Sequence, residues 1–230
     1  MDFGGNRGAF SQAAEARFGL KPALIVEANP ELARKLRENA GWTVENCAVS
    51  SRDGVLSFNI AANDEGSSIL ALPDQSALGC TAVGTVSVQS RTLESLAAAL
   101  PPGPIDLLKV DIEGAEVEVL LTSPESVLRR FSQITVEFHC DPVFGFGGRA
   151  EVERVIARMR SLGFECLWFD FTFRDVLFVH HRQLGLSAMD RLRMRLVPAP
   201  PPVLSKAWFA LPAPVRRAIK SGVARVRGTA

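Results

Sequence analysis

The sequence lacks the features that would place it in a membrane, outside the cell or around a structural metal. No apolar run reaches the roughly 18 residues that a transmembrane helix requires. The first five residues are acidic and glycine-rich, where a secretory signal would be basic and then apolar. The four cysteines are widely spaced and none belongs to a C-x-x-C pair, which disfavours a zinc site or a redox motif. We therefore expect a cytoplasmic protein with free thiols and no resident metal.

Charge is unevenly divided along the chain. The 230 residues have a net charge of +1, and this length fits one α/β domain better than two. Residues 189–230 contain nine Lys or Arg and one acidic residue, a net charge of +8, whereas residues 1–188 have a net charge of −7. We therefore divide the chain into a domain over residues 1–188 and a basic, proline-containing helical tail over residues 189–230.

The tail admits three interpretations. A proline-rich spacer at residues 198–202 precedes two helical candidates, at 204–211 and 215–226, and the second is amphipathic and basic. The tail could make peripheral contact with an anionic membrane surface, dock on the acidic body of this or another chain, or extend into solvent. It has no aromatic stacking pattern, so we expect no nucleic-acid partner. The sequence leaves the oligomeric state open.

Segments typical of buried strands alternate with segments typical of helices. Apolar runs predict strands at residues 23–27, 42–49, 105–111 and 132–138. Helical spacing and caps predict helices at 9–18, 30–40, 92–100, 115–121 and 149–162. Alternating residues at 55–60 and 85–90 indicate an antiparallel excursion, and 164–169 with 176–179 predict a closing hairpin. This order predicts an α/β fold with a doubly wound, mostly parallel sheet.

A glycine-rich loop, Asp2-Phe3-Gly4-Gly5-Asn6-Arg7-Gly8, precedes the first predicted helix. Glycines allow a positive φ and a close approach of the backbone to a ligand, and the N–H groups of a helix N-terminus can bind an anionic group. Such loops also serve as plain turns. Glu27, at the end of the next strand, is the second feature: in nucleoside-binding α/β folds an acid there accepts hydrogen bonds from the ribose hydroxyls. A solvated strand-end glutamate is the alternative.

Acidic residues cluster after the strand at 105–111. This strand delivers Asp111 and Glu113 to the carboxyl edge of the sheet, where ligands bind in such folds. Clustered carboxylates need a cation, a proton or a polar substrate, and Lys109 in the same strand is a candidate buried partner. Alternatively, these acids only begin the next helix, where their negative charge interacts favourably with the helix dipole. This interaction alone would explain Glu116.

His139 follows Glu137 at the end of the next strand. A histidine can remove a hydroxyl proton near neutral pH, which makes His139 a candidate base and Glu137 its competitor. A lone histidine at a strand end is also often structural.

Taken together, these residues resemble the FkbM-type methyltransferases. The loop from Asp2 to Gly8 is similar to their cofactor loop, Val26–Pro30 to their acidic ribose strand and Asn46–Ser50 to the segment beside the adenine. The closest match is the K-x-D-x-E-G-x-E element over Lys109–Glu116. The resemblance extends from residue 2 to about residue 180 and implies a Rossmann-like class I methyltransferase fold, here with a truncated first strand.

The resemblance implies S-adenosyl-L-methionine as methyl donor and a hydroxyl of a small molecule, sugar, glycan or secondary metabolite as acceptor. The cofactor-binding residues that it implies are Asp2, Gly4, Asn6, Gly8, Glu27, Asn46, Ala48 and Asp111. Transfer would be an in-line displacement, for which the protein mainly positions donor and acceptor. A hydroxyl acceptor also needs a base, for which Asp111 and His139 are the candidates, with Glu113 or Glu137 orienting the acceptor.

Three alternatives remain. Asp111 with Glu137 could hold Mg²⁺, which would polarise the acceptor oxygen. A nicotinamide-dependent oxidoreductase also uses a glycine loop and a strand-end acid, although this loop lacks the G-x-G-x-x-G spacing. The short first strand suggests a catalytically impaired cofactor-binding module. The stretches that would shape the acceptor pocket, residues 60–85 and 139–150, carry no readable specificity pattern.

Overall fold

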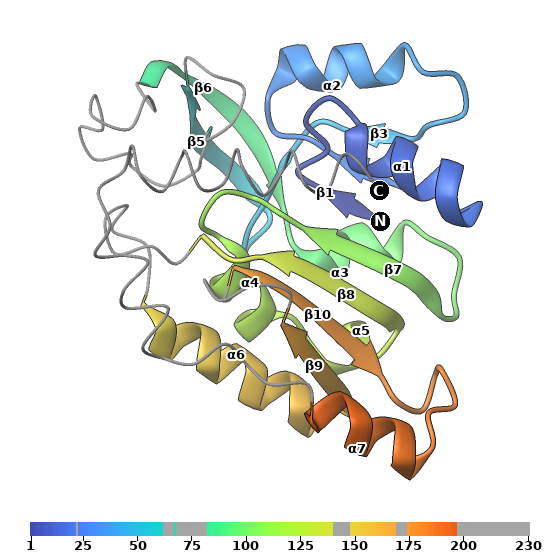
Figure 1. The fold of residues 1–230 in the computed structure, drawn as a ribbon. Helices are drawn as coiled ribbons and strands as arrows, with labels where there is room; N and C mark the ends of the chain where they lie inside the picture. Colours follow the sequence, from blue (N-terminus) through green and yellow to red (C-terminus); the bar gives the residue numbers. More distant parts are fainter. Residues whose placement is uncertain (22, 62–66, 68–81, 140–147, 169–173, 197–230) are drawn as a thin grey trace, which may run out of the picture.

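The computed structural model describes residues 1–21, 23–61, 67, 82–139, 148–168 and 174–196. It is an α/β fold, and its main sheet has seven strands in the order β3-β2-β1-β7-β8-β10-β9 (Figure 1). Neighbouring strands from β3 to β8 are parallel, and β10 is antiparallel to both β8 and β9. The predicted mostly parallel sheet with a closing hairpin is confirmed. In sheet order the strands are Val44–Glu45, Ile25–Val26, Asp2–Phe3, Ile105–Val110, Phe131–Glu137, Asp175–His180 and Phe164–Trp168.

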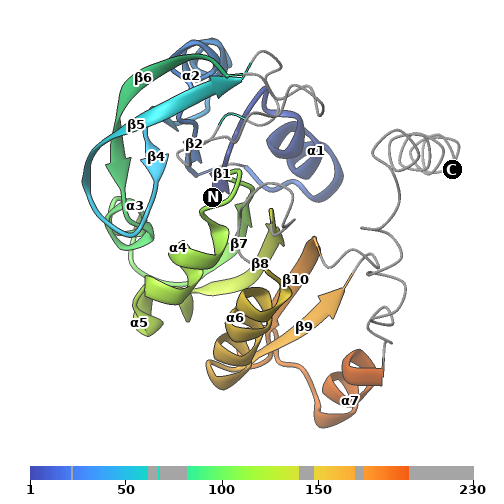
Figure 2. The ribbon, with the colours of Figure 1, turned by 90° about the vertical axis from the view of Figure 1, so that its left-hand side faces the viewer.

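Helices cover both faces of this sheet. Helix α1 lies on one side of the central strands, and α3, α4, α5 and α6 lie on the other (Figure 2). The helices are α1 (Ala9–Phe18), α2 (Pro30–Arg37), α3 (Leu93–Ala98), α4 (Glu116–Thr122), α5 (Glu125–Leu128), α6 (Arg149–Ser161) and α7 (Ala188–Leu196). The short helix α5 was not predicted from the sequence.

Strand β1 is short, as expected, yet it occupies the centre of the sheet. Asp2 pairs with Ile25 on one side and with Lys109 on the other, and Phe3 pairs with Val26 and Val110. Phe3 is completely buried. Since parallel strands align their carboxyl ends, the loop that follows β1 emerges beside the ends of β2 and β7.

Residues 42–49, predicted as one strand, form two strands in different sheets, so that prediction was wrong. Strand β3 (Val44–Glu45) pairs with β2, whereas β4 (Ala48–Val49) pairs with β6. Between them the Asn46 side chain donates to the carbonyl oxygens of Glu27 at 2.8 Å and Ala28 at 3.1 Å. Residue type alone could not reveal this break, because no glycine or proline separates the two short strands.

The second sheet has three strands in the order β4-β6-β5. Strands β5 (Gly54–Ala61) and β6 (Ala82–Arg91) pair antiparallel over almost their whole length, which confirms the predicted excursion. Phe58 and Val88 form a small apolar cluster with Ala48. Ala28, in the segment that follows β2, packs against this cluster and so connects the second sheet to the first.

Local side-chain caps set where two of the helices begin. Asn29 precedes α2 and accepts hydrogen bonds from the N–H groups of Glu31 at 2.9 Å and Leu32 at 3.4 Å, as its cap preference predicts. Thr92 caps α3 by accepting from the N–H of Ser95 at 3.1 Å. Helix α2 therefore begins at Pro30, as predicted, whereas α3 begins at Leu93, one residue after its predicted start.

The described part of the tail is helix α7, which lies against β9. Both Arg191 and Arg195 bind the buried carboxylate of Glu165, with N–O distances of 2.7 to 2.9 Å. The two helical candidates at 204–211 and 215–226 lie outside the described residues. Among the helices that the structure describes, none is long and apolar enough to cross a membrane.

Candidate active site at the ends of the central strands

A cavity of about 70 Å³ opens where strands β1, β2 and β7 end. Its described walls come from six separate segments of the chain, which the fold brings together. The described lining residues are Gly4, Asn6, Val26, Glu27, Ala28, Asn29, Leu32, Cys47, Ala48, Val49, Phe58, Ser67, Asp111, Ile112 and Glu113.

Glu27 lies at the end of β2 with its carboxylate held by two backbone groups. The N–H of Asn6 donates to Oε2 at 2.7 Å, and the N–H of Asn29 donates to Oε1 at 2.8 Å. Burial raises the pKa of Glu27, and these two N–H groups partly offset that effect. Since a carboxylate oxygen has two lone pairs, each oxygen retains an acceptor position for a ligand. The sequence placed Glu27 correctly at this edge.

Gly4 is required by the close approach of β1 and β7. A Cβ at this position would lie 1.8 Å from the carbonyl oxygen of Asp111, and the φ of Gly4 is +78°. Because the obstacle is backbone, no side-chain movement could relieve the clash. The absence of a side chain at Gly4 therefore lets the loop and Asp111 share one wall of the cavity.

Three of the residues implied to bind cofactor are absent from the cavity lining. Asp2 lies behind the loop, where its Oδ2 accepts a hydrogen bond from the Ser11 hydroxyl at 2.6 Å. Gly8 precedes α1 at a φ of +80°, and a Cβ there would lie 2.6 Å from the Trp42 ring. Asn46 binds the backbone after β2, as described above. These three residues support the walls, whereas Gly4, Asn6, Glu27, Ala48 and Asp111 line them.

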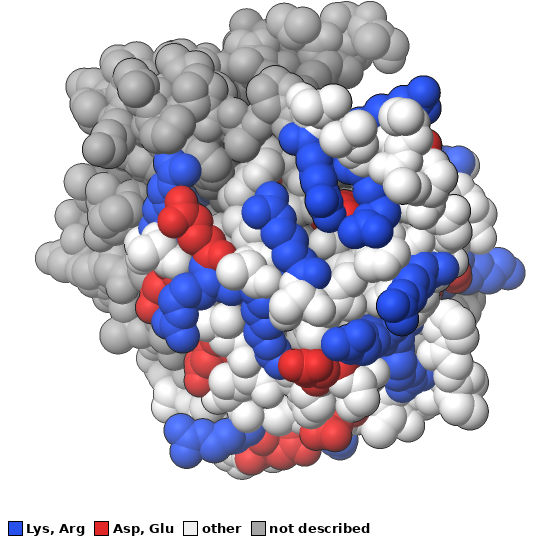
Figure 3. Space-filling model, turned by 90° about the horizontal axis from the view of Figure 1, so that it is seen from below, with Lys and Arg blue, Asp and Glu red and all other residues white. Residues whose placement is uncertain are grey.

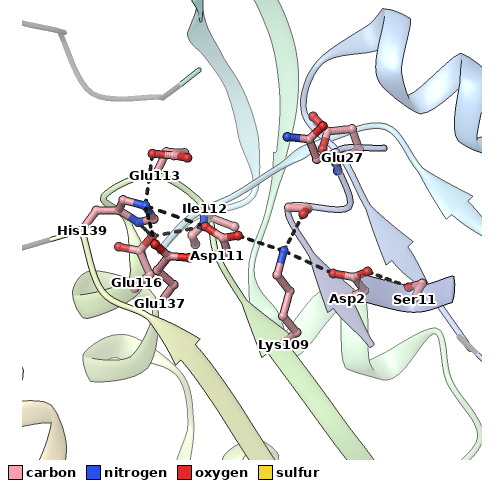
Figure 4. A network of polar contacts seen from close by, with 12 residues as sticks. Asp2, Ser11, Glu27, Lys109, Asp111, Ile112, Glu113, Glu116, Glu137 and His139 are labelled. Carbon is pink, nitrogen blue, oxygen red and sulfur yellow. Dashed lines mark hydrogen bonds and ion pairs between the residues drawn. The ribbon is translucent and has the colours of Figure 1, made fainter. Parts of the chain in front are cut away.

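Lys109 connects the glycine loop to the acidic segment. It was predicted to be a buried partner of the clustered carboxylates. Its Nζ donates to the carbonyl oxygen of Gly4 at 2.7 Å and lies 3.1 Å from Asp111 Oδ2 and 3.6 Å from Asp2 Oδ1 (Figure 4). Burial opposes the charge of Lys109, but the carboxylates of Asp2 and Asp111 outweigh it and raise its pKa. The ammonium group therefore stays charged and fixes both sides of the cavity.

His139 lies among four carboxylates at the outer end of the same network. Its Nδ1 is 2.8 Å from Glu116 Oε1, and its Nε2 is 3.3 Å from Glu113, 3.8 Å from Asp111 and 4.0 Å from Glu137. The structure thus brings together all four residues predicted as catalytic (Figure 4). Burial alone would lower the pKa of His139, but Glu116 and Glu113 raise it to about 9.

Glu116 is a component of this network that the sequence interpretation had assigned only to the helix dipole. Its carboxylate is 1% exposed and also accepts the backbone N–H groups of Ile112 at 3.1 Å and Gly114 at 3.0 Å. Burial opposes ionisation, but His139 and the Gly114 N–H lower the pKa of Glu116. An ionised Glu116 facing a protonated His139 is the resulting arrangement near neutral pH.

Two residues with side chains adopt left-handed backbone conformations at this cavity. Asn6 has a φ of 46° and Glu113 a φ of 56°. Asparagine tolerates this region, but glutamate rarely adopts it, and such conformations concentrate at functional sites. Burial also raises the pKa of Glu113, with the neighbouring acids contributing and His139 opposing.

Arg174 is a second contributor that sequence reasoning missed. Its guanidinium donates to Glu137 Oε1 at 2.7 Å, although 37 residues separate the two in the chain. The pairing depends on the antiparallel addition of β10 beside β8, which places the start of one strand at the end of the other. No local sequence signal marks Arg174 as part of this site.

Asp111, Glu113 and His139 each offer a ligand atom within 4.8 Å of the other two, a spacing that could hold a metal ion. The set differs from the Asp111 and Glu137 pair considered from the sequence. A cation there would compete with the imidazolium for the same carboxylates.

Comparison with known proteins gives one match. The family model described as the methyltransferase FkbM domain matches residues 2–166. No curated protein matches significantly, and no solved structure does so. The match includes every residue of the network from Asp2 to His139.

Proposed function

Since the chain belongs to the FkbM methyltransferase family, we propose that it is an S-adenosyl-L-methionine-dependent O-methyltransferase. Its acceptor would be a hydroxyl of a sugar, a glycan or a secondary metabolite. The observation that carries the proposal is the convergence of Glu27, the Gly4 loop and the Asp111 segment on one cavity.

The lining fits a nucleoside with a charged appendage. Glu27 offers free acceptor positions for ribose hydroxyls. Ala48, Val49 and Phe58 provide an apolar wall for a base. At the other end, Gly4 lies against the backbone of Asp111, and both residues line the cavity.

When bound, S-adenosyl-L-methionine supplies an electrophilic methyl group on a sulfonium. Asp111 and Glu113 line the cavity and would direct negative charge toward that cation. Lys109 holds Asp111 and Gly4 in fixed relation, so the protein's contribution is chiefly the alignment of donor and acceptor.

For the base we favour Glu113 over His139. The His139 ring is protonated at neutral pH, because its pKa is about 9, and it then has no free lone pair to accept a proton. Glu113 lines the cavity, and burial raises its pKa toward the range suited to proton transfer. Asp111, bound to Lys109, would orient the acceptor hydroxyl.

Glu27→Ala should weaken binding of S-adenosyl-L-methionine by at least about ten-fold, because hydrogen bonds to a charged group contribute roughly 1.5–3 kcal/mol each. Isothermal titration calorimetry measures this directly. Glu45→Ala is the matched control, since Glu45 ends the adjacent strand and its side chain is 44% exposed outside the cavity. Failure of the wild-type chain to bind the cofactor, or equal affinity in Glu27→Ala, would refute the proposal.

Methyl transfer is best assayed with a labelled methyl donor across a panel of sugars, glycans and hydroxylated metabolites. Loss of transfer in EDTA, restored by Mg²⁺, would favour a metal-assisted mechanism at Asp111, Glu113 and His139. Cofactor binding without transfer to any acceptor would favour an impaired binding module.

A further inference from the structure

Helix α7 presents large apolar side chains to solvent. The described residues include six exposed large apolar side chains, and four of them, Leu184, Met189, Leu192 and Leu196, lie within residues 184–196. Met189 is 56%, Leu192 49% and Leu196 70% exposed. Spacings of three and four residues place these three on one face of the helix. This apolar stripe is the reverse of the usual pattern, in which the polar face of a surface helix meets water.

The orientation of the stripe is fixed by ion pairs on a neighbouring face of α7. Arg191 and Arg195, four residues apart, both bind Glu165 of β9, whose side chain is only 3% exposed. Ser187 and Asp190 also hydrogen-bond reciprocally at the start of the helix. The helix therefore cannot rotate to bury Met189, Leu192 and Leu196 against the domain without breaking these contacts.

The surface around the stripe is basic. Arg193 and Arg195 are 74% and 60% exposed; Arg193 lies 3.8 Å from Asp190, and Arg195 pairs with Glu165. Figure 3 views the molecule from below, the side on which α7 lies in Figure 1, and Lys and Arg predominate over acidic residues on the described part of that face. The sequence from 197 to 230 adds six Lys or Arg and no acidic residue.

We propose that the apolar stripe of α7, with its flanking arginines, docks the protein on an anionic lipid surface. Apolar side chains would enter the boundary between headgroups and acyl chains while arginines pair with lipid phosphates. Residues 197–230 of this chain, or the same face of a second copy, would bring further positive charge to a surface where Lys and Arg already predominate. Charge complementarity thus favours the lipid. The stripe lies on the β9 edge of the sheet, apart from the cavity at β1 and β2, so this inference is independent of the proposed function.

Vesicle flotation with the full chain tests this inference. Wild-type protein should float with vesicles of equal parts phosphatidylcholine and phosphatidylglycerol, and should remain behind with pure phosphatidylcholine or at high salt. The double variant Leu192→Ser/Leu196→Ser should bind the anionic vesicles at least about ten-fold more weakly. Arg193→Gln should weaken binding about five-fold, since one basic residue near the surface contributes about 1 kcal/mol.

The matched control is Phe18→Ser/Val55→Ser, which removes two exposed apolar side chains elsewhere and should bind like wild type. Circular dichroism should show that all variants remain folded, because every substituted side chain is exposed. The inference is overturned if wild type does not float, or if Leu192→Ser/Leu196→Ser floats equally well, which would assign binding to residues 197–230 alone. It is also overturned if light scattering reveals a dimer that the double variant dissociates, because a second copy would then cover the stripe.

Discussion

Replacing Gly4 with alanine is expected to lower the free energy of unfolding by more than about 3 kcal/mol, or to prevent folding altogether. The added Cβ would lie 1.8 Å from the carbonyl oxygen of Asp111, and the φ of +78° is itself unfavourable for an L side chain. Relief would require β1 and β7 to separate at the centre of the sheet. Chemical denaturation followed by circular dichroism measures the loss.

Gly41→Ala separates the two causes. Gly41 has a φ of +101°, and a Cβ there would meet nothing within 4 Å. This control should therefore cost only the conformational penalty, about 1–2 kcal/mol. Equal stability of Gly4→Ala and Gly41→Ala would show that the close approach of Gly4 to Asp111 does not constrain the fold.

His139→Gln is expected to destabilise the protein by about 3–5 kcal/mol at neutral pH, because it leaves the buried Glu116 carboxylate without its cation. Glu116 is 1% exposed and lies 2.8 Å from His139 Nδ1. The double variant Glu116→Gln/His139→Gln removes both charges and should recover part of this loss. Urea denaturation of the single and double variants measures the coupling. If the double variant loses the sum of the two single losses, the two side chains do not interact as described.

The same pair predicts how stability depends on pH. His139 has a folded pKa of about 9, raised from its ordinary value of 6.5. Its contribution is therefore fully present below about pH 6.5 and is lost as the pH rises through about 9. The loss should be on the order of 3 kcal/mol in wild type and absent in His139→Gln. If the free energy of unfolding changes equally with pH in wild type and in His139→Gln between neutral and alkaline pH, His139 is not the group responsible.

Sequence patterns located Glu27, Asp111 and His139 correctly, since each ends an apolar run and parallel strands carry such residues to one edge. Other features depend on contacts between distant segments. Arg174 reaches Glu137 only because β10 adds antiparallel to β8, and Asn46 ends β3 by binding backbone after β2. Neither contact produces a periodic pattern of residues that could be recognised in the sequence.

The role of Glu116 was missed for a different reason. An acid in the first turn of a helix is common and has a sufficient explanation in the helix dipole. Only its burial and its contact with His139 distinguish it from such a residue. The stretches expected to shape the acceptor pocket, 60–85 and 139–150, fall largely outside the described residues, so the acceptor class rests on the family resemblance.

The central position of the two-residue strand β1 has a consequence for the order of folding. Its partners are residues 25–26 on one side and 109–110 on the other, so the second pairing closes a loop of more than a hundred residues. Closing so long a loop costs considerable chain entropy, and so short a strand has little stability of its own before both neighbours are present. The seven-stranded sheet should therefore be completed late. The cavity needs Gly4 beside Asp111, so it comes into existence only at that last step.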